Sequence, residues 1–124
     1  MHNAEELTGR IIECVIEVHK SLGPGFAEGV YHNALMLEFV ERGMSADRER
    51  QITIYYKGKI VGTHRLDIVV DDSIILELKT VETLSKAHYA QLRSYLKAAG
   101  IGIGLLINFS EAKADYRRVE YPPR

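Results

Sequence analysis

The sequence has no tryptophan, only three prolines and a single cysteine among its 124 residues. One cysteine cannot form a disulfide within the chain, so a reducing compartment is expected. No stretch approaches the roughly 18 consecutive apolar residues that a membrane-spanning helix needs, and residues 1–6 lack the basic and apolar regions of a secretory signal. The expected protein is therefore cytoplasmic, with no membrane partner.

The sequence also has little excess charge of either sign. Its 16 Lys and Arg nearly balance its 17 Asp and Glu, which leaves a formal net charge of −1. Overall charge therefore does not indicate a polyanionic partner, and any nucleic-acid contact has to come from a local basic patch. With 46% hydrophobic and 27% charged residues, the chain has the size and composition of one globular domain over residues 1–124.

The periodicity of the apolar residues predicts the secondary structure. Helical spacing followed by a glycine recurs in three segments, at about 4–21, 27–41 and 85–99. Apolar runs predict strands at 51–56, 60–70, 74–79 and 101–109, with a further strand at 116–120. The order α-α-β-β-β-α-β, with the extra strand last, predicts an α/β (α+β) protein with a mixed sheet flanked by helices. The run at 101–109 follows a helix, so it is expected to pair parallel to an earlier strand.

Two adjacent strands carry the most specific pattern. Strict alternation over 64–70 and 74–79 predicts one apolar face, made of Leu66, Ile68, Val70, Ile74, Leu76 and Leu78. The opposite face is predicted to carry Arg65, Asp67, Glu77 and Lys79. A turn centred on Asp72 would set Asp67 opposite Glu77, Arg65 opposite Lys79, and Val69 opposite Ile75.

Two carboxylates placed side by side in a sheet need an explanation. Like charges directly opposite each other destabilise a sheet, and a cation between them is the simplest reason to tolerate them. Asp67 and Glu77 are therefore interpreted as a metal site. The alternative is that Arg65 and Lys79 neutralise them in a surface salt-bridge ladder, which would add little stability.

The remaining reactive side chains form no familiar catalytic pattern. The five histidines lack metal-ligand spacing, so no zinc site is predicted. His32 lies four residues after Glu28 and His64 three before Asp67, so either can approach the same site, although such histidines more often lie at the surface or behind it. Cys14 shares a helical stripe with apolar residues and is expected in the core rather than as a nucleophile.

Several motifs resemble, in the same order, those of the PD-(D/E)XK nuclease superfamily. A helix with Glu28 is followed by a strand with Asp67, a strand with Glu77-Leu78-Lys79, a helix and a strand. Residues 25–31, Gly-Phe-Ala-Glu-Gly-Val-Tyr, resemble the GxxExxY motif that names a small bacterial and archaeal family within that superfamily. The likeness also includes segments 22–25, 65–67 and 91–96, so it covers about residues 7–109. Leu66 stands where the superfamily has proline, which divergent members often lack.

The resemblance implies a restriction-endonuclease-like core and a Mg2+- or Mn2+-dependent endonuclease that hydrolyses phosphodiester bonds of nucleic acid, with DNA as the expected substrate. Asp67, Glu77 and the main-chain carbonyl of Leu78 would bind one or two of these ions, and Glu28 would complete the acidic cluster. Hard divalent cations prefer such oxygen ligands. Lys79, on the same face as Glu77, would position the attacking water or stabilise the transition state.

The resemblance also marks residues around the acidic cluster. Gln91 is similar to a polar residue that contacts the site or the substrate phosphate in many relatives, so it is expected to be catalytic. The residues assigned to substrate binding are Arg65, Tyr31, Tyr95 and Arg93. Each has a structural alternative. Glu28 in the first turn of a helix interacts favourably with the helix dipole, and the others can be ordinary packing or solvated-face residues.

The competing hypothesis is a noncatalytic module that keeps this fold and binds nucleic acid or a protein partner. Retention of Asp67, Glu77 and Lys79 together favours the nuclease, whereas the low net charge and small size favour the module. With no recognition domain evident, a nuclease of this size would recognise nucleic-acid structure, act as a homodimer or be directed by a protein partner.

Overall fold

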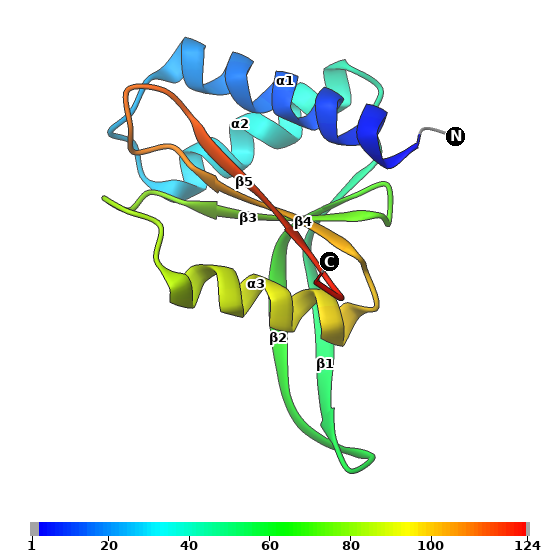
Figure 1. Ribbon diagram of the computed structural model, residues 1–124. Coiled ribbons are helices and arrows are strands. Elements are labelled where there is room, and N and C mark those ends of the chain that lie inside the picture. Colours follow the sequence, from blue (N-terminus) through cyan, green and yellow to red (C-terminus); the bar gives the residue numbers. More distant parts are fainter. Residues whose placement is uncertain (1–2, 124) are drawn as a thin grey trace.

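The computed structural model describes residues 3–123, which form three helices and five strands (Figure 1). In chain order these are α1 (Ala4–Leu22), α2 (Glu28–Glu41), β1 (Ala46–Tyr56), β2 (Lys59–Val70), β3 (Ile74–Lys79), α3 (Lys86–Ala99), β4 (Ile103–Asn108) and β5 (Asp115–Glu120). The order confirms the expected architecture, including the last strand. None of the described helices is long and apolar enough to cross a membrane.

The five strands form one mixed sheet in the order β1-β2-β3-β4-β5. Strand β3 pairs with β4 in parallel, and every other neighbouring pair is antiparallel. A parallel pair needs a long crossover connection, and α3 supplies it. The expectation that the apolar run after this helix returns parallel to an earlier strand is therefore confirmed.

The helices cover the sheet on both faces, with α1 and α2 on one face and α3 on the other (Figure 1). The α1–α2 face buries Cys14 with Leu7, Ile11 and Val18, as their helical spacing predicts. On the α3 face, a Cβ at Gly104 would lie 3.0 Å from side-chain atoms of Leu92. Glycine at this position therefore lets α3 pack closely on β4.

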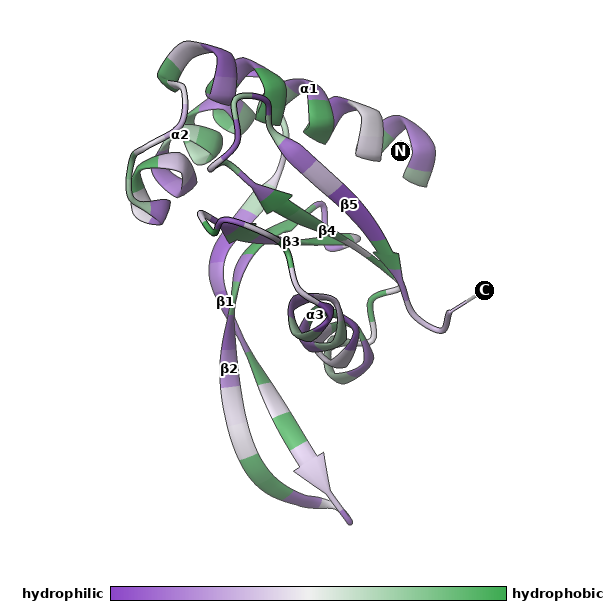
Figure 2. Ribbon diagram, turned by 60° about the vertical axis from the view of Figure 1, so that its left-hand side comes forward, coloured by the Kyte–Doolittle hydropathy of each residue, from purple (hydrophilic) through white to green (hydrophobic). Residues whose placement is uncertain are grey.

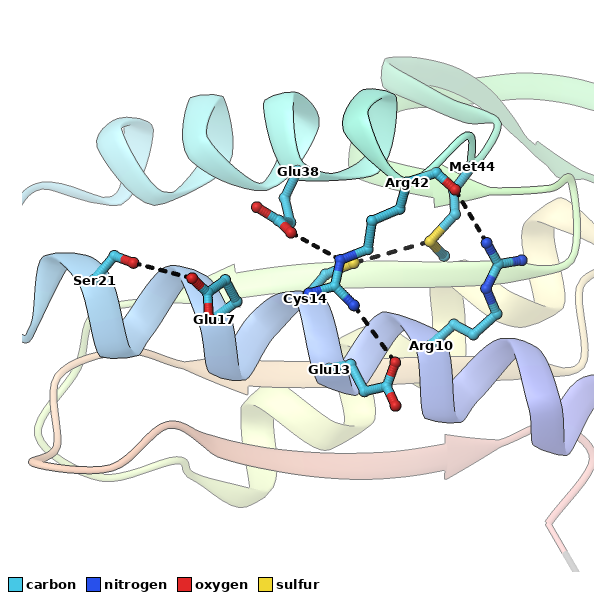
Figure 3. Close-up of polar contacts among 8 residues, drawn as sticks. All are labelled: Arg10, Glu13, Cys14, Glu17, Ser21, Glu38, Arg42 and Met44. Carbon is cyan, nitrogen blue, oxygen red and sulfur yellow. Dashed lines mark hydrogen bonds and ion pairs between the residues drawn. The ribbon is translucent and has the colours of Figure 1, made fainter.

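Polar contacts fix α2 against α1 (Figure 3). The Arg42 guanidinium at the end of α2 pairs with Glu38 at 2.7 Å and with Glu13 of α1 at 3.4 Å. Beneath this pair, the Cys14 thiol lies 3.8 Å from the sulfur of Met44. These contacts set the position of α2, which carries Glu28 at its other end.

Strand β1 begins five residues earlier than its alternation predicts. Residues 46–50 are mostly charged and carry no strand pattern, but they pair with β2, for example Arg48 with Ile68. The Arg50 side chain is held by ion pairs to Asp47 and Asp72. Pairing with a neighbouring strand thus overrides the weak local preference.

The strict alternation predicted for β2 is wrong at Leu66. This residue packs on the α3 face with Val69 and Ile75, whereas Ile68 and Val70 pack on the α1–α2 face. The side-chain pattern changes around Asp67, where β2 stops pairing with β3 and continues with β1 alone. From there the β1–β2 hairpin projects away from the sheet (Figure 1).

Candidate active site

The hairpin register around the two predicted carboxylates follows from the ladder between β2 and β3. The paired residues are Val70 with Ile74, Val69 with Ile75, and Ile68 with Leu76. This confirms the turn centred on Asp72 and the pairing of Val69 with Ile75. The ladder ends at Ile68, so the next positions on the two strands, Asp67 and Glu77, lie at the point where the strands separate.

The Asp67 carboxylate joins the two strands beyond the end of the ladder. Its Oδ2 accepts a hydrogen bond of 2.8 Å from the main-chain N–H of Leu78. A side-chain acceptor thus satisfies an N–H that would otherwise be buried without a partner. The bond also fixes the Asp67 carboxylate beside the strand that carries Glu77.

Glu77 is a buried carboxyl group, with the residue only 6% exposed. Among the described residues its Oε1 has no hydrogen-bond partner. Burial, followed by the charge and hydrogen bonding of the Asp67 carboxylate, raises the pKa of Glu77 to about 9, and the charge of Lys79 opposes this shift. A cation beside this pair would favour the ionised form of Glu77.

Lys79 and Glu28 bring two further charges to this pair. The Lys79 ammonium, at the end of β3, opposes the rise in the pKa values of both Glu77 and Glu28. Glu28 is the first residue of α2, and partial burial of its carboxyl group, followed by the charge of Asp67, raises its pKa. Asp67 and Lys79 therefore interact electrostatically with both Glu28 and Glu77.

Tyr31 holds the turn that leads into α2. Its hydroxyl donates to the carbonyl of Gly23 at 2.6 Å and accepts from the N–H of Phe26 at 3.2 Å. Its ring stacks on Phe109 with centroids 4.3 Å apart. Gly25 has φ of 109°, which side chains rarely adopt, so glycine suits this turn. Tyr31 thus supports the segment that positions Glu28, and it contacts this turn and the core.

His32 lies close to Asp67, and the sequence analysis allowed for its approach to the site while favouring a position at the surface or behind it. It is buried one turn after Glu28, close to the main chain of Asp67. Burial and the nearby charge of Arg48 lower its pKa, while Asp67 opposes this shift. Its Nε2 has no partner among the described residues. The available signal was its spacing of four residues from Glu28, which places both on one helix face.

His64 of β2 and Tyr95 of α3 pack on each other near the carboxylates. Their rings stack with centroids 3.8 Å apart. Burial raises the pKa of Tyr95, and the charges of Glu77 and Asp67 add to this effect. Burial lowers the pKa of His64, against the effect of Asp67. The Tyr95 hydroxyl therefore interacts electrostatically with both carboxylates.

Three predicted site residues are not brought into this cluster. Arg65 is exposed and pairs with Gln51 of β1, so the expected pairing of Arg65 with Lys79 does not form. Gln91 is exposed on α3, and within residues 3–123 no hydrogen bond or ion pair links it to the carboxylates. Arg93 lines a cavity between α3 and β5.

Asn108 secures the segment that follows Lys79, and sequence reasoning missed it. Its amide accepts from the N–H of Val81 at 3.1 Å and donates to the carbonyl of Val81 at 2.8 Å. The N–H of Phe109 bonds the carbonyl of Lys79 at 3.0 Å. Asn108 is buried. The sequence feature that could have identified it is a single amide side chain at the end of a continuous apolar strand.

The donor set fits a hard divalent cation. Asp67 and Glu77 offer carboxylate oxygens, and Glu77 Oε1 is buried without a partner. Among residues 3–123, no three His, Cys, Asp or Glu side chains stand together in a ready-made ligand cage. Mg2+ commonly binds through one or two carboxylates, with water and substrate phosphate completing its shell. Two carboxylates are thus a sufficient protein contribution.

Comparison with known protein families identifies the family of the chain. The chain matches the model of a family described as the PD-(D/E)XK nuclease superfamily over residues 5–119. The match covers most of the chain, so the protein belongs to the PD-(D/E)XK nuclease superfamily. Members of this superfamily typically use a divalent metal. No curated protein matches the sequence.

Two solved structures share the fold. The crystal structure of SSO0001 matches with a TM-score of 0.61 and 21% identity, over 77% of this chain and 50% of that one. An alkaline exonuclease, LHK-Exo from Laribacter hongkongensis, matches with a TM-score of 0.53 and 14% identity, over 97% of this chain and 72% of that one. The chain therefore spans about half the length of SSO0001. These matches make the fold restriction-endonuclease-like.

Proposed function

We propose that this chain is a Mg2+- or Mn2+-dependent phosphodiesterase that cleaves nucleic acid, with DNA as the expected substrate. The observation that carries the proposal is the buried carboxyl of Glu77, which has an unpartnered oxygen and lies beside the Asp67 carboxylate. Such a pair is costly to bury without a cation. Membership of the PD-(D/E)XK nuclease superfamily supports the assignment of this pair as metal ligands.

The roles of the residues follow from their positions. Asp67, Glu77 and the carbonyl of Leu78 would hold the ion, which when bound supplies an activated water and shields the charge of the phosphodiester. Lys79 places a positive charge beside the carboxylates, where it stabilises the charge that develops on the phosphate in the transition state. Glu28 adds a third carboxylate from α2.

Within the superfamily, we assign the chain to the GxxExxY family. The motif names three residues, which lie in one turn and in the helix that follows it: Gly25, Glu28 and Tyr31. Tyr31 holds the turn around Gly25, and this turn leads directly into α2 at Glu28. We therefore interpret the motif as the segment that positions the Glu28 carboxylate near Asp67.

A nuclease confined to this chain acts as one domain and needs a way to select its substrate. A homodimer or a targeting protein partner would supply that selection, and the first alternative is common for two-strand cleavage. Gln91, Arg65 and Arg93 remain candidates for contacts that form only with substrate, because side chains at a free site often move when the substrate binds.

The test is a cleavage assay with Mg2+ and with Mn2+ on single-stranded, double-stranded and branched DNA and RNA. Wild type and Asp67→Asn are purified identically, and Asp115→Asn on β5 serves as the matched control. Cleavage by the wild type and the control, with loss in Asp67→Asn, supports the nuclease. Equal behaviour of all three proteins on every substrate rejects it and favours a noncatalytic nucleic-acid or protein-binding module.

A further inference from the structure

The β1–β2 hairpin projects from the body of the protein as an arm, which we define as residues 51–66 (Figure 2). We infer that this arm binds single-stranded nucleic acid and feeds it to the carboxylate cluster. The role given to the arm rests on the proposed function. The experiment below measures binding alone and therefore does not depend on that function. It goes beyond that function by naming the substrate class and the surface that selects it.

The arm is basic although the protein as a whole is not. Residues 51–66 contain Lys57, Lys59 and Arg65 and no Asp or Glu, in a chain whose formal net charge is −1. Residues 83–110, which include α3, also contain no Asp or Glu. All 17 acidic residues therefore lie outside these two segments. A local concentration of positive charge of this kind favours a phosphate backbone.

The tip of the arm also exposes flat aromatic surface. Tyr55 and Tyr56 are 63% and 62% exposed, next to Ile60 and Val61 at 66% and 61%. The ammonium of Lys57 lies 5.4 Å from the centre of the Tyr56 ring. Exposed tyrosines flanked by lysines can stack on unpaired bases while the lysines contact the phosphates.

The base of the arm lies near the carboxylates. His64, near the end of the arm, stacks on Tyr95 of α3, whose hydroxyl interacts with the charges of Asp67 and Glu77. Beside it, the arm and α3 enclose a groove of about 420 Å³ lined by Thr53, Ile54, Tyr55, Ser94, Lys97 and Ala98. The groove contains another lysine and no carboxylate. Lys97 therefore adds positive charge between the tip of the arm and the site.

The alternative occupant of the exposed β1 edge is a second copy of this chain. The β1 part of the arm, residues 51–56, carries no charged side chain, so charge neither favours nor opposes such pairing. The basic residues of the arm, Lys57, Lys59 and Arg65, find no acidic partner in a copy of the same arm, whereas a polyanion supplies phosphates for them. A base has its stacking face exposed only when it is unpaired, so the tyrosines favour a single strand over a duplex.

The test measures binding without cleavage. Fluorescence anisotropy in EDTA compares labelled oligo(dT) and oligo(U) of about 20 nucleotides, longer than the site of one small domain, with a duplex of the same length. The arm variants are Lys57→Gln/Lys59→Gln and Tyr55→Ser/Tyr56→Ser. The matched controls are Lys20→Gln/Lys113→Gln and Tyr116→Ser, which alter exposed residues on the α1 side. Light scattering reports the oligomeric state of each protein.

The inference predicts that both single strands bind more tightly than the duplex. Each lysine that loses a phosphate contact should reduce the slope of log K against log salt concentration by about 0.7. Loss of the tyrosines should weaken binding at least about fivefold, and the controls should bind like the wild type. A preference of the wild type for oligo(dT) or oligo(U) then identifies DNA or RNA as the strand.

Four results would overturn the inference. These are no single-strand binding by the wild type, equal binding of duplex, arm variants that bind like the wild type, or arm variants that change only the oligomeric state. The proposed function is judged separately. Arm-dependent binding without cleavage in any metal leaves the inference standing and rejects the nuclease, and cleavage with affinity independent of the arm does the reverse.

Discussion

The carboxylate of Asp67 accepts a hydrogen bond from the main-chain N–H of Leu78 across the point where β2 and β3 separate. The same side chain raises the pKa of Glu77 through its charge. Asp67 therefore has a structural role and an electrostatic role, and the two can be separated by substitution. The isosteric change keeps an acceptor oxygen, whereas truncation removes it.

Asp67→Asn should fold about as stably as the wild type without metal, because it keeps the acceptor for the Leu78 N–H. Asp67→Ala should lose about 1–3 kcal/mol, because the Leu78 N–H is left without its partner. Urea denaturation in EDTA measures both. Equal stability of the two variants would show that this hydrogen bond does not support the hairpin.

Lys79→Met should bind Mn2+ at least as well as the wild type, because it removes a positive charge that competes with the ion beside Glu77. Its cleavage rate should fall about 10²–10³-fold if the ammonium acts in the transition state. Calorimetric Mn2+ titration and single-turnover cleavage give the two readings, with Lys113→Met as the control. Weaker Mn2+ binding in Lys79→Met would assign the lysine to the metal site itself.

Tyr31→Phe should destabilise the protein by about 0.5–1.5 kcal/mol, because the hydroxyl joins the Gly23 carbonyl to the Phe26 N–H. The ring still stacks on Phe109, so the fold should be kept. The exposed Tyr116→Phe is the matched control. An unchanged denaturation midpoint in Tyr31→Phe would mean that these bonds do not secure the turn before α2.

The order of the elements and the hairpin register could be predicted from the sequence because both depend on local patterns. Apolar spacing predicted the helices, and the two short runs around Asp72 predicted the pairing of Val69 with Ile75. The strand character of residues 46–50 and the switch of Leu66 to the α3 face could not be predicted. Both features depend on which strands are neighbours in the sheet. The periodicity of apolar residues carries no information about strand neighbours.

The site was predictable to the extent that its residues adjoin in sequence or face one another across a hairpin. Asp67, Glu77 and Lys79 meet these conditions, and their charges interact. The contacts of His32 with Asp67 and of Asn108 with Val81 join elements far apart in the chain. Only tertiary packing reveals such contacts. The catalytic roles assigned to the cluster stay predictions.

Stability should depend on pH through Cys14 (Figure 3). Burial raises the pKa of its thiol to about 11, with the charge of Arg42 opposing the shift. The unfolded thiol ionises near its ordinary value of 9.0, so between that pH and about 11 the folded state binds more protons. Stability is therefore lost as pH rises through this window. Comparison of urea denaturation across it should show a shallower decline in Cys14→Ala than in the wild type, and parallel declines would contradict a buried neutral thiol.

The central claim is that Asp67 and Glu77 together hold a divalent cation. Calorimetric titration of Mn2+ into the wild type, Asp67→Asn, Glu77→Gln and the control Asp115→Asn tests it most directly. The account predicts saturable binding in the wild type and the control, and affinity at least about tenfold weaker in each site variant, since each loses a charged oxygen ligand. Equal Mn2+ affinity in all four proteins would contradict the account and place any metal elsewhere.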